Sequence, residues 1–181
     1  MPVTFETTPN PATMKFKFDR IISKESKEFL DVQSTDISPL AAKLFGFPWT
    51  SAVFLGEDFV TVTKQDWVEW EILASPLAGL LDEHIESGQP ILVKLAAAVA
   101  DENESDSDVV KQIKRILKTD IKPVVALDGG DIVFVYYENQ ILQIRMQGAC
   151  SGCPSSQATL KDGIEVRMKE LVPEIKEVVA V

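Results

Sequence analysis

A run of acidic and serine residues near the middle of the chain constrains the fold more than any other feature. It extends from 101 to 108 and follows a stretch of small residues from 96 to 100. The run has no apolar side chain to bury and its like charges repel one another, so an extended linker is expected. The sequence therefore predicts two domains, residues 1–95 and 108–181, joined by a linker over residues 96–107.

Charge is distributed unevenly between these parts. Residues 108–181 hold equal numbers of basic and acidic side chains, so the whole formal net charge of −10 belongs to the first 107 residues. Without a concentrated basic patch, nucleic acids and anionic membranes are poor partners. No apolar run approaches the roughly 20 residues that span a bilayer. The first residues lack the order of a secretory signal and the arginine-rich character of a transit peptide, which predicts a cytoplasmic protein.

The first domain is expected to be a small α/β sheet with helices on one face. Alternating residues predict a strand over 14–18, and Ser38 followed by Pro39 predicts the start of a short helix that Gly46 ends. Two β-prone segments, 52–55 and 59–63, predict a hairpin, and apolar residues at helical spacing follow from 76 to 85.

The second domain is expected to follow the order helix, strand, strand, helix, strand. Asp108 is a candidate N-cap for the first helix, and Pro123 is expected to end it. The other expected elements are strands over 132–137 and 141–146 joined by 138–140, a helix with Leu160, Ile164, Met168 and Leu171 on one stripe, and a last strand within 174–181. The fold class is therefore α+β, as two small α/β domains.

The chain has two cysteines, Cys150 and Cys153, which is too few for a disulfide-stapled domain and suggests metal or redox chemistry. Cys153 sits just before a predicted helix, whose first N–H groups favour the thiolate form. The glycines Gly148 and Gly152 let the backbone turn tightly around a bulky ligand. Soft thiolates select zinc, copper(I) or iron–sulfur centres.

The number of ligands then bears on assembly. A cluster or a structural zinc usually takes four ligands, and this chain offers two thiolates. The single histidine, His84, lies in the other domain and is better explained as a packing or surface residue. Two chains together would supply four thiolates, so Cys150 and Cys153 predict a half-site that is completed by a homodimer. Such an open site suits transfer better than storage.

Three functions remain open on spacing alone: an iron–sulfur half-site, a zinc half-site in a dimer or adaptor, and a dithiol redox pair. A thioredoxin-like redox site should start the first helix of a βαβ unit. Here the cysteines follow a predicted antiparallel hairpin late in the domain, which disfavours the redox function. A purely structural site is also disfavoured, since two ligands cannot close it within one chain.

Other candidate residues have simpler explanations. Asp128 and Asp131 flank two glycines and are expected to form a turn before a strand, although an acid pair could also bind a cation. Of Trp49, Trp67 and Trp70, at least two are expected in the core, the alternative being a surface that binds another protein. The chain offers no catalytic constellation and is not expected to be an enzyme.

Longer motifs carry a resemblance to the Nfu family of NifU-like proteins. In the second domain they are Asp128-Gly129-Gly130-Asp131, Gln147-Gly148-Ala149-Cys150-Ser151-Gly152-Cys153-Pro154-Ser155-Ser156, Thr159 through Glu165, and Val172 through Val178. In the first domain they are Thr8 through Phe16, and Ser38-Pro39-Leu40-Ala41 through Phe54-Leu55-Gly56. The chain thus resembles an Nfu N-terminal domain followed by a NifU-like C-terminal domain.

This resemblance implies a specific function. Family members hold a labile iron–sulfur cluster, usually 4Fe–4S, between two C-terminal domains and pass it to apo iron–sulfur proteins. The family's ligand positions fall on Cys150 and Cys153. The implied partners are apo client proteins and other cluster-assembly factors, with the N-terminal domain helping to recognise them.

Overall fold

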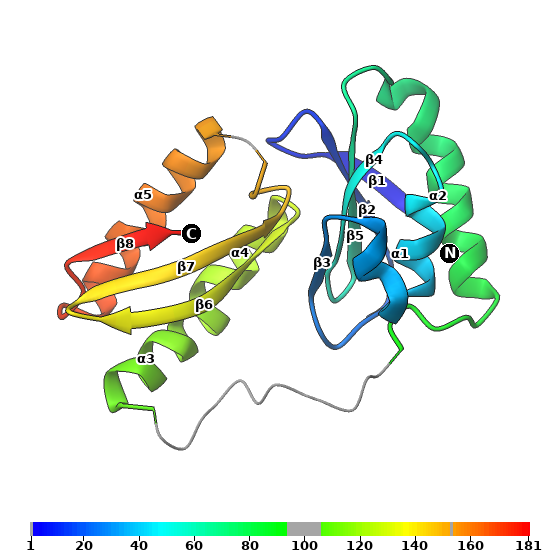
Figure 1. The fold of residues 1–181 in the computed structure, drawn as a ribbon. Coiled ribbons are helices and arrows are strands. Elements are labelled where there is room, and N and C mark those ends of the chain that lie inside the picture. The colour runs from blue at the N-terminus through cyan, green and yellow to red at the C-terminus, as the bar shows by residue number, and fades with distance from the viewer. Residues whose placement is uncertain (1, 94–105, 153) are drawn as a thin grey trace. The chain divides into compact units, whose positions relative to one another are not determined.

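The computed structural model describes residues 2–93, 106–152 and 154–181 and divides into two compact units, Met1–Ala97 and Ala98–Val181 (Figure 1). Both units combine helices with a sheet, so the predicted α+β class is confirmed. The predicted linker, 96–107, falls almost wholly outside the described residues and stays a prediction. Among the described helices, none is both long and apolar enough to cross a membrane.

The N-terminal unit is built on a five-stranded antiparallel sheet with strand order β1-β2-β5-β4-β3. Its elements are β1 (Thr4–Thr7), β2 (Thr13–Lys17), β3 (Lys27–Phe29), the 3-10 helix η1 (Val32–Ile37), α1 (Pro39–Phe45), β4 (Thr50–Leu55), β5 (Phe59–Lys64) and α2 (Trp70–Glu86). The β4–β5 hairpin and the β2 strand follow the sequence prediction. Strand β1, at the edge of the sheet, was not predicted.

Both helices of this unit share one core with a single face of the sheet (Figure 1). Phe16 and Val60 lie opposite each other on neighbouring strands and are fully buried. Leu44 of α1 and Leu81 of α2 are fully buried in the same cluster. Because alternate strand residues point to one face, this pairing places the apolar set under the helices. The predicted layer of helices on one face is therefore observed.

The ends of α1 follow from its sequence. The Ser38 hydroxyl accepts a hydrogen bond from the Ala41 N–H at 3.0 Å, and Pro39 occupies the first turn. Such a side-chain cap satisfies one of the helix's first N–H groups, which have no partner within the helix. Gly46 is the C-cap residue. Both ends of α1 therefore lie where the sequence predicts them.

The tryptophans divide as expected. Trp49 is buried and stacks on Phe47, with ring centroids 5.2 Å apart. Trp70 packs edge-on against the buried Phe16 ring, with centroids 6.4 Å apart. Trp67, by contrast, is 68% exposed. Two of the three therefore serve packing, and Trp67 does not.

The C-terminal unit has a three-stranded sheet of order β6-β7-β8, in which β7 is antiparallel to β6 and parallel to β8. Its elements are α3 (Asp108–Ile116), the π-helical turn η2 (Leu117–Ile121), α4 (Lys122–Leu127), β6 (Gly130–Glu138), β7 (Ile141–Gly148), α5 (Pro154–Leu171) and β8 (Glu177–Ala180). Leu142 and Ile144 of β7 are fully buried, whereas Arg145 is exposed. The helices cover the buried face of the sheet (Figure 1).

The first helical segment of this unit does not end at Pro123, as the sequence predicted. It continues through η2 into α4, where Pro123 lies in the first turn. Proline has no N–H, and inside a regular α-helix its ring clashes with the carbonyl one turn earlier. A π-turn widens the helix at this point, and the Lys122 N–H donates to the Leu117 carbonyl. The N-cap prediction is also corrected: Ser107, not Asp108, caps α3.

Candidate metal centre

Cys150 lies in the tight loop that follows β7 and precedes α5. Gly148, the last residue of β7, has a φ of 69°, a left-handed conformation that glycine adopts without strain. The Ala149 N–H donates to the Gly129 carbonyl at 3.1 Å, and the Ser151 N–H donates to the Gly148 carbonyl at 3.1 Å. The tight turn that the sequence predicted at Gly148 is therefore confirmed. Backbone hydrogen bonds on either side hold Cys150 at the centre of this loop.

Gly130, at the start of β6, forms one wall of the Cys150 site. It pairs with Gly148 in the β6–β7 register, which brings its Cα against the cysteine loop. A Cβ added to Gly130 would lie 2.5 Å from the Cys150 Sγ and 2.8 Å from the Gln147 carbonyl oxygen. Only glycine leaves room for the thiol here. This role was missed from the sequence, although the Gly129-Gly130 pair was visible in it.

Cys150 itself is 5% exposed and packs into the core of its unit. Burial raises the pKa of its thiol to about 12, with smaller contributions from the negative charges of Asp128 and Asp131. Burial disfavours the charged thiolate, and nearby carboxylates oppose a further negative charge. The expectation that this loop stabilises thiolates is therefore wrong for Cys150, whose pKa is raised and not lowered. To bind a metal ion, this thiol has to release its proton.

This raised pKa predicts slow alkylation of Cys150. In a Cys153→Ser chain at pH 8, we expect iodoacetamide to react roughly 100-fold or more slowly with the folded protein than with the urea-unfolded protein, because the thiolate is the reactive form. The rate should rise as the pH approaches 12. Mass spectrometry of quenched samples measures it. Equal rates in the folded and unfolded chain would contradict the burial of this thiol.

Asp131 has a structural role in the turn. It is buried, its Oδ1 accepts the Ile132 N–H at 2.7 Å, and its Oδ2 pairs with the Lys122 Nζ at 3.3 Å. Asp128 follows α4 as its C-cap residue. These contacts agree with the expected turn before β6. Together the two carboxylates also add negative charge beside Cys150.

Cys153 lies outside the described residues, so its predicted role as a ligand stays a prediction. On either side of it, the structure describes the loop and helix α5. The Gln157 Nε2 donates to the Ser151 carbonyl at 2.6 Å, which ties the first turns of α5 to the loop. Within the described part of the chain, no cluster of three or more His, Cys, Asp or Glu side chains is arranged to hold a metal ion.

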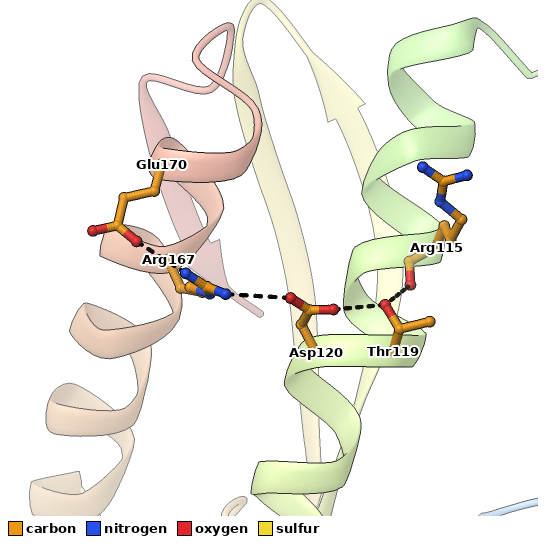
Figure 2. Close-up of polar contacts among 5 residues, drawn as sticks. All are labelled: Arg115, Thr119, Asp120, Arg167 and Glu170. Atoms are coloured by element: carbon orange, nitrogen blue, oxygen red, sulfur yellow. Dashed lines mark hydrogen bonds and ion pairs between the residues drawn. The ribbon is translucent and has the colours of Figure 1, made fainter.

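Polar contacts connect α5 to the π-helical turn further from the cysteine loop. Figure 2 shows Arg167 between Asp120 and Glu170, at 3.5 Å and 3.3 Å respectively. The Thr119 Oγ1 lies 2.7 Å from Asp120 Oδ1 and 3.0 Å from the Arg115 carbonyl. Asp120 is half-buried and the other residues are exposed, and ion pairs near the surface contribute about 0–1 kcal/mol each. The buried side chains Ile164 and Met168 therefore do most to position α5.

His84 is a packing residue of the N-terminal unit. It lies on α2 and is 1% exposed. Burial lowers the pKa of its imidazole, the nearby Lys43 lowers it further, and a backbone contact with Pro90 partly opposes both. A neutral, buried ring on the apolar face of α2 agrees with the packing role expected from the sequence.

Comparison with known proteins matches each unit to a family model. Residues 3–88 match the model described as scaffold protein Nfu/NifU N terminal, and residues 113–179 match the NifU-like domain. NifU-like protein 4, mitochondrial, of Arabidopsis thaliana is 42% identical over 94% of this chain. The NFU1 iron-sulfur cluster scaffold homolog, mitochondrial, of Drosophila persimilis is 38% identical over 96% of it. The solution structure of a Saccharomyces cerevisiae NifU-like protein, 23% identical, covers 51% of this chain and 85% of its own, with a TM-score of 0.45.

These relatives correct the expected location and identify the family. Both curated relatives are named as mitochondrial, which contradicts the cytoplasmic location predicted from the first residues. The chain spans 62% of the length of each, so its own first residues are a poor guide to compartment. The two family models match in the order that the sequence motifs predicted. The chain belongs to the Nfu family of NifU-like iron–sulfur cluster scaffold proteins.

Proposed function

We propose that this chain binds an iron–sulfur cluster through Cys150 and Cys153 and passes it to apo-proteins, without catalysing a reaction of its own. The observation that supports this most is the position of Cys150, in a hydrogen-bonded loop against Gly130 within the NifU-like unit. Two thiolates leave a cluster's coordination incomplete, so the same pair from a second chain supplies the rest. The cargo is a 4Fe–4S cluster shared by a homodimer.

The charges near Cys150 favour release of the cluster over storage. A cluster held by four thiolates carries net negative charge, and Asp128 and Asp131 already oppose negative charge at this thiol. The protein therefore stabilises the bound cluster weakly, and client cysteines replace its thiolates one at a time. The partners are apo iron–sulfur proteins and other assembly factors.

The other two functions of a cysteine pair are less well supported. A thiol oxidoreductase that uses Cys150 as its nucleophile needs a thiolate there, and burial raises the pKa of this thiol. A zinc-bridged dimer uses the same four thiolates but has no reason to release its metal. Both alternatives differ from a cluster carrier in what the purified chain takes up.

Anaerobic reconstitution with ferrous iron and sulfide separates these functions. The cluster carrier should become brown, with thiolate-to-iron absorption, and should then activate an apo 4Fe–4S enzyme when the two are mixed. The control is the same mixture with free iron and sulfide at equal concentration and a chelator. Redox cycling of a monomer without cluster uptake, or zinc retained in preference to iron and sulfide, would contradict the proposal.

A further inference from the structure

An open groove of about 570 Å³ lies in the N-terminal unit, where the start of α2 meets β1 and β2. Its apolar lining includes Phe5 of β1, Met14 of β2 and Trp70 of α2. Phe5 is 45% exposed although its ring centroid lies 6.0 Å from that of the buried Phe16. The groove therefore presents the Phe5 ring to solvent, next to the buried Phe16 ring of the core.

Three carboxylates also line this groove. They belong to Asp66 and Glu69, just before α2, and to Glu71 in its first turn. All three residues are exposed, and none has an ion-pair partner among the residues that the structure describes. The one basic residue in the lining, Lys64, is buried, with its Nζ 3.5 Å from the Gln65 carbonyl. The groove thus combines apolar surface with an acidic rim.

The same chain segment exposes two further large apolar side chains. Trp67 is 68% exposed and Ile72 is 70% exposed, and each lies next in sequence to an acidic groove residue. Exposed aromatic and aliphatic side chains in one contiguous region commonly mark a surface that binds another protein. Because these side chains are not needed in the core, the segment 66–72 has the composition of a docking site.

We propose that this groove docks a basic, amphipathic segment of a partner protein, with arginine or lysine against the acidic rim and an apolar side chain against Phe5 and Trp70. Charge complementarity selects this occupant. Residues 1–93 hold seven basic and fourteen acidic side chains, so a second copy of this unit would be repelled. The chain's own run at 101–108 is acidic and would be repelled as well. An anionic membrane or a nucleic acid is negatively charged like the rim of the groove, so neither is expected to bind there.

This inference does not depend on cluster binding and can be tested on the cluster-free chain with both of its units present. The probe is a labelled synthetic peptide in which arginines flank leucines, and fluorescence anisotropy measures its Kd at low and physiological salt. The test variant is D66N/E69Q/E71Q. Its matched control is D82N/E83Q/E86Q, which removes the same types and number of charges from the other end of α2. The nearest members of the two sets, Glu71 and Asp82, are 11 residues apart on α2, roughly 16 Å along the helix axis and beyond the Debye length of about 8 Å.

The D66N/E69Q/E71Q variant is expected to raise the Kd of the peptide roughly tenfold, because it loses several exposed ion pairs with the peptide's arginines. The control variant should change it less than twofold. Phe5→Ala should also weaken binding, with the salt dependence unchanged, after circular dichroism has verified the fold. The inference is overturned if both triple variants weaken binding equally, if the peptide does not bind at low salt, or if a peptide with glutamates in place of arginines binds as well.

Discussion

Replacing Cys150 with alanine is expected to abolish binding of the iron–sulfur cluster while leaving the fold intact. Alanine fills part of the space of the buried thiol and adds no polar group, so the core of the C-terminal unit should tolerate it. With one thiolate lost from each chain, a dimer keeps two of four cluster ligands. Iron and sulfide bound after anaerobic reconstitution should fall to the level of a protein-free control.

Two comparisons make this result specific. Cys153→Ala should have the same effect, because both thiolates are proposed ligands. Ser151→Ala removes a loop side chain whose Oγ donates to the Gly148 carbonyl at 2.8 Å, but leaves both thiols in place. That variant should still bind cluster. Retention of a full cluster by Cys150→Ala would refute the assignment of this residue as a ligand.

Replacing Gly130 with alanine is expected to destabilise the C-terminal unit by about 1–3 kcal/mol, as overpacking of a filled site does. The new Cβ would lie 2.5 Å from the Cys150 Sγ and 2.8 Å from a backbone oxygen of β7. The thiol can rotate away, but the backbone oxygen cannot move without disturbing the β6–β7 pairing. Cluster binding should fall along with stability, because the Cys150 thiol is displaced from its position.

The chain provides its own controls for this measurement. All three tryptophans lie in the N-terminal unit and both tyrosines, Tyr136 and Tyr137, in the C-terminal unit. In urea unfolding, Gly130→Ala should shift the tyrosine transition and leave the tryptophan transition unchanged. Gly163→Ala, where an added Cβ meets nothing within 4 Å, should instead stabilise α5 by roughly 0.5–1 kcal/mol. If Gly130→Ala is as stable as the unchanged chain, Gly130 does not pack tightly against Cys150 and the Gln147 carbonyl.

The parts of the fold that the sequence predicts well are those decided by neighbours along the chain. Helix α1 begins at a serine cap with proline behind it, and the β4–β5 hairpin surrounds a short turn. The extension of the helix past Pro123 was missed because a π-turn depends on how the widened helix packs over β6. Edge strand β1 was missed because its four residues are all exposed and carry no strong apolar alternation.

For the site, the sequence identifies the chemical groups but not their environment. Cys150 and the turning glycine Gly148 follow from the motif itself. The burial of Cys150, the direction of its pKa shift and the role of Gly130 follow from the β6–β7 register, which joins residues 18 positions apart along the chain. The partial positive charge at a helix start favours the thiolate form, but burial has the larger effect on Cys150 and raises the pKa of its thiol.

The mass of the cluster-loaded protein tests the central claim most directly. Native mass spectrometry or light scattering under anaerobic conditions, combined with iron and sulfide analysis, gives the number of chains for each cluster. A shared half-site predicts one cluster in a particle of twice the 20.0 kDa chain mass, which returns to a single chain when a chelator removes the iron. A full cluster bound to a single chain, or a dimer whose mass does not depend on iron, would contradict this account.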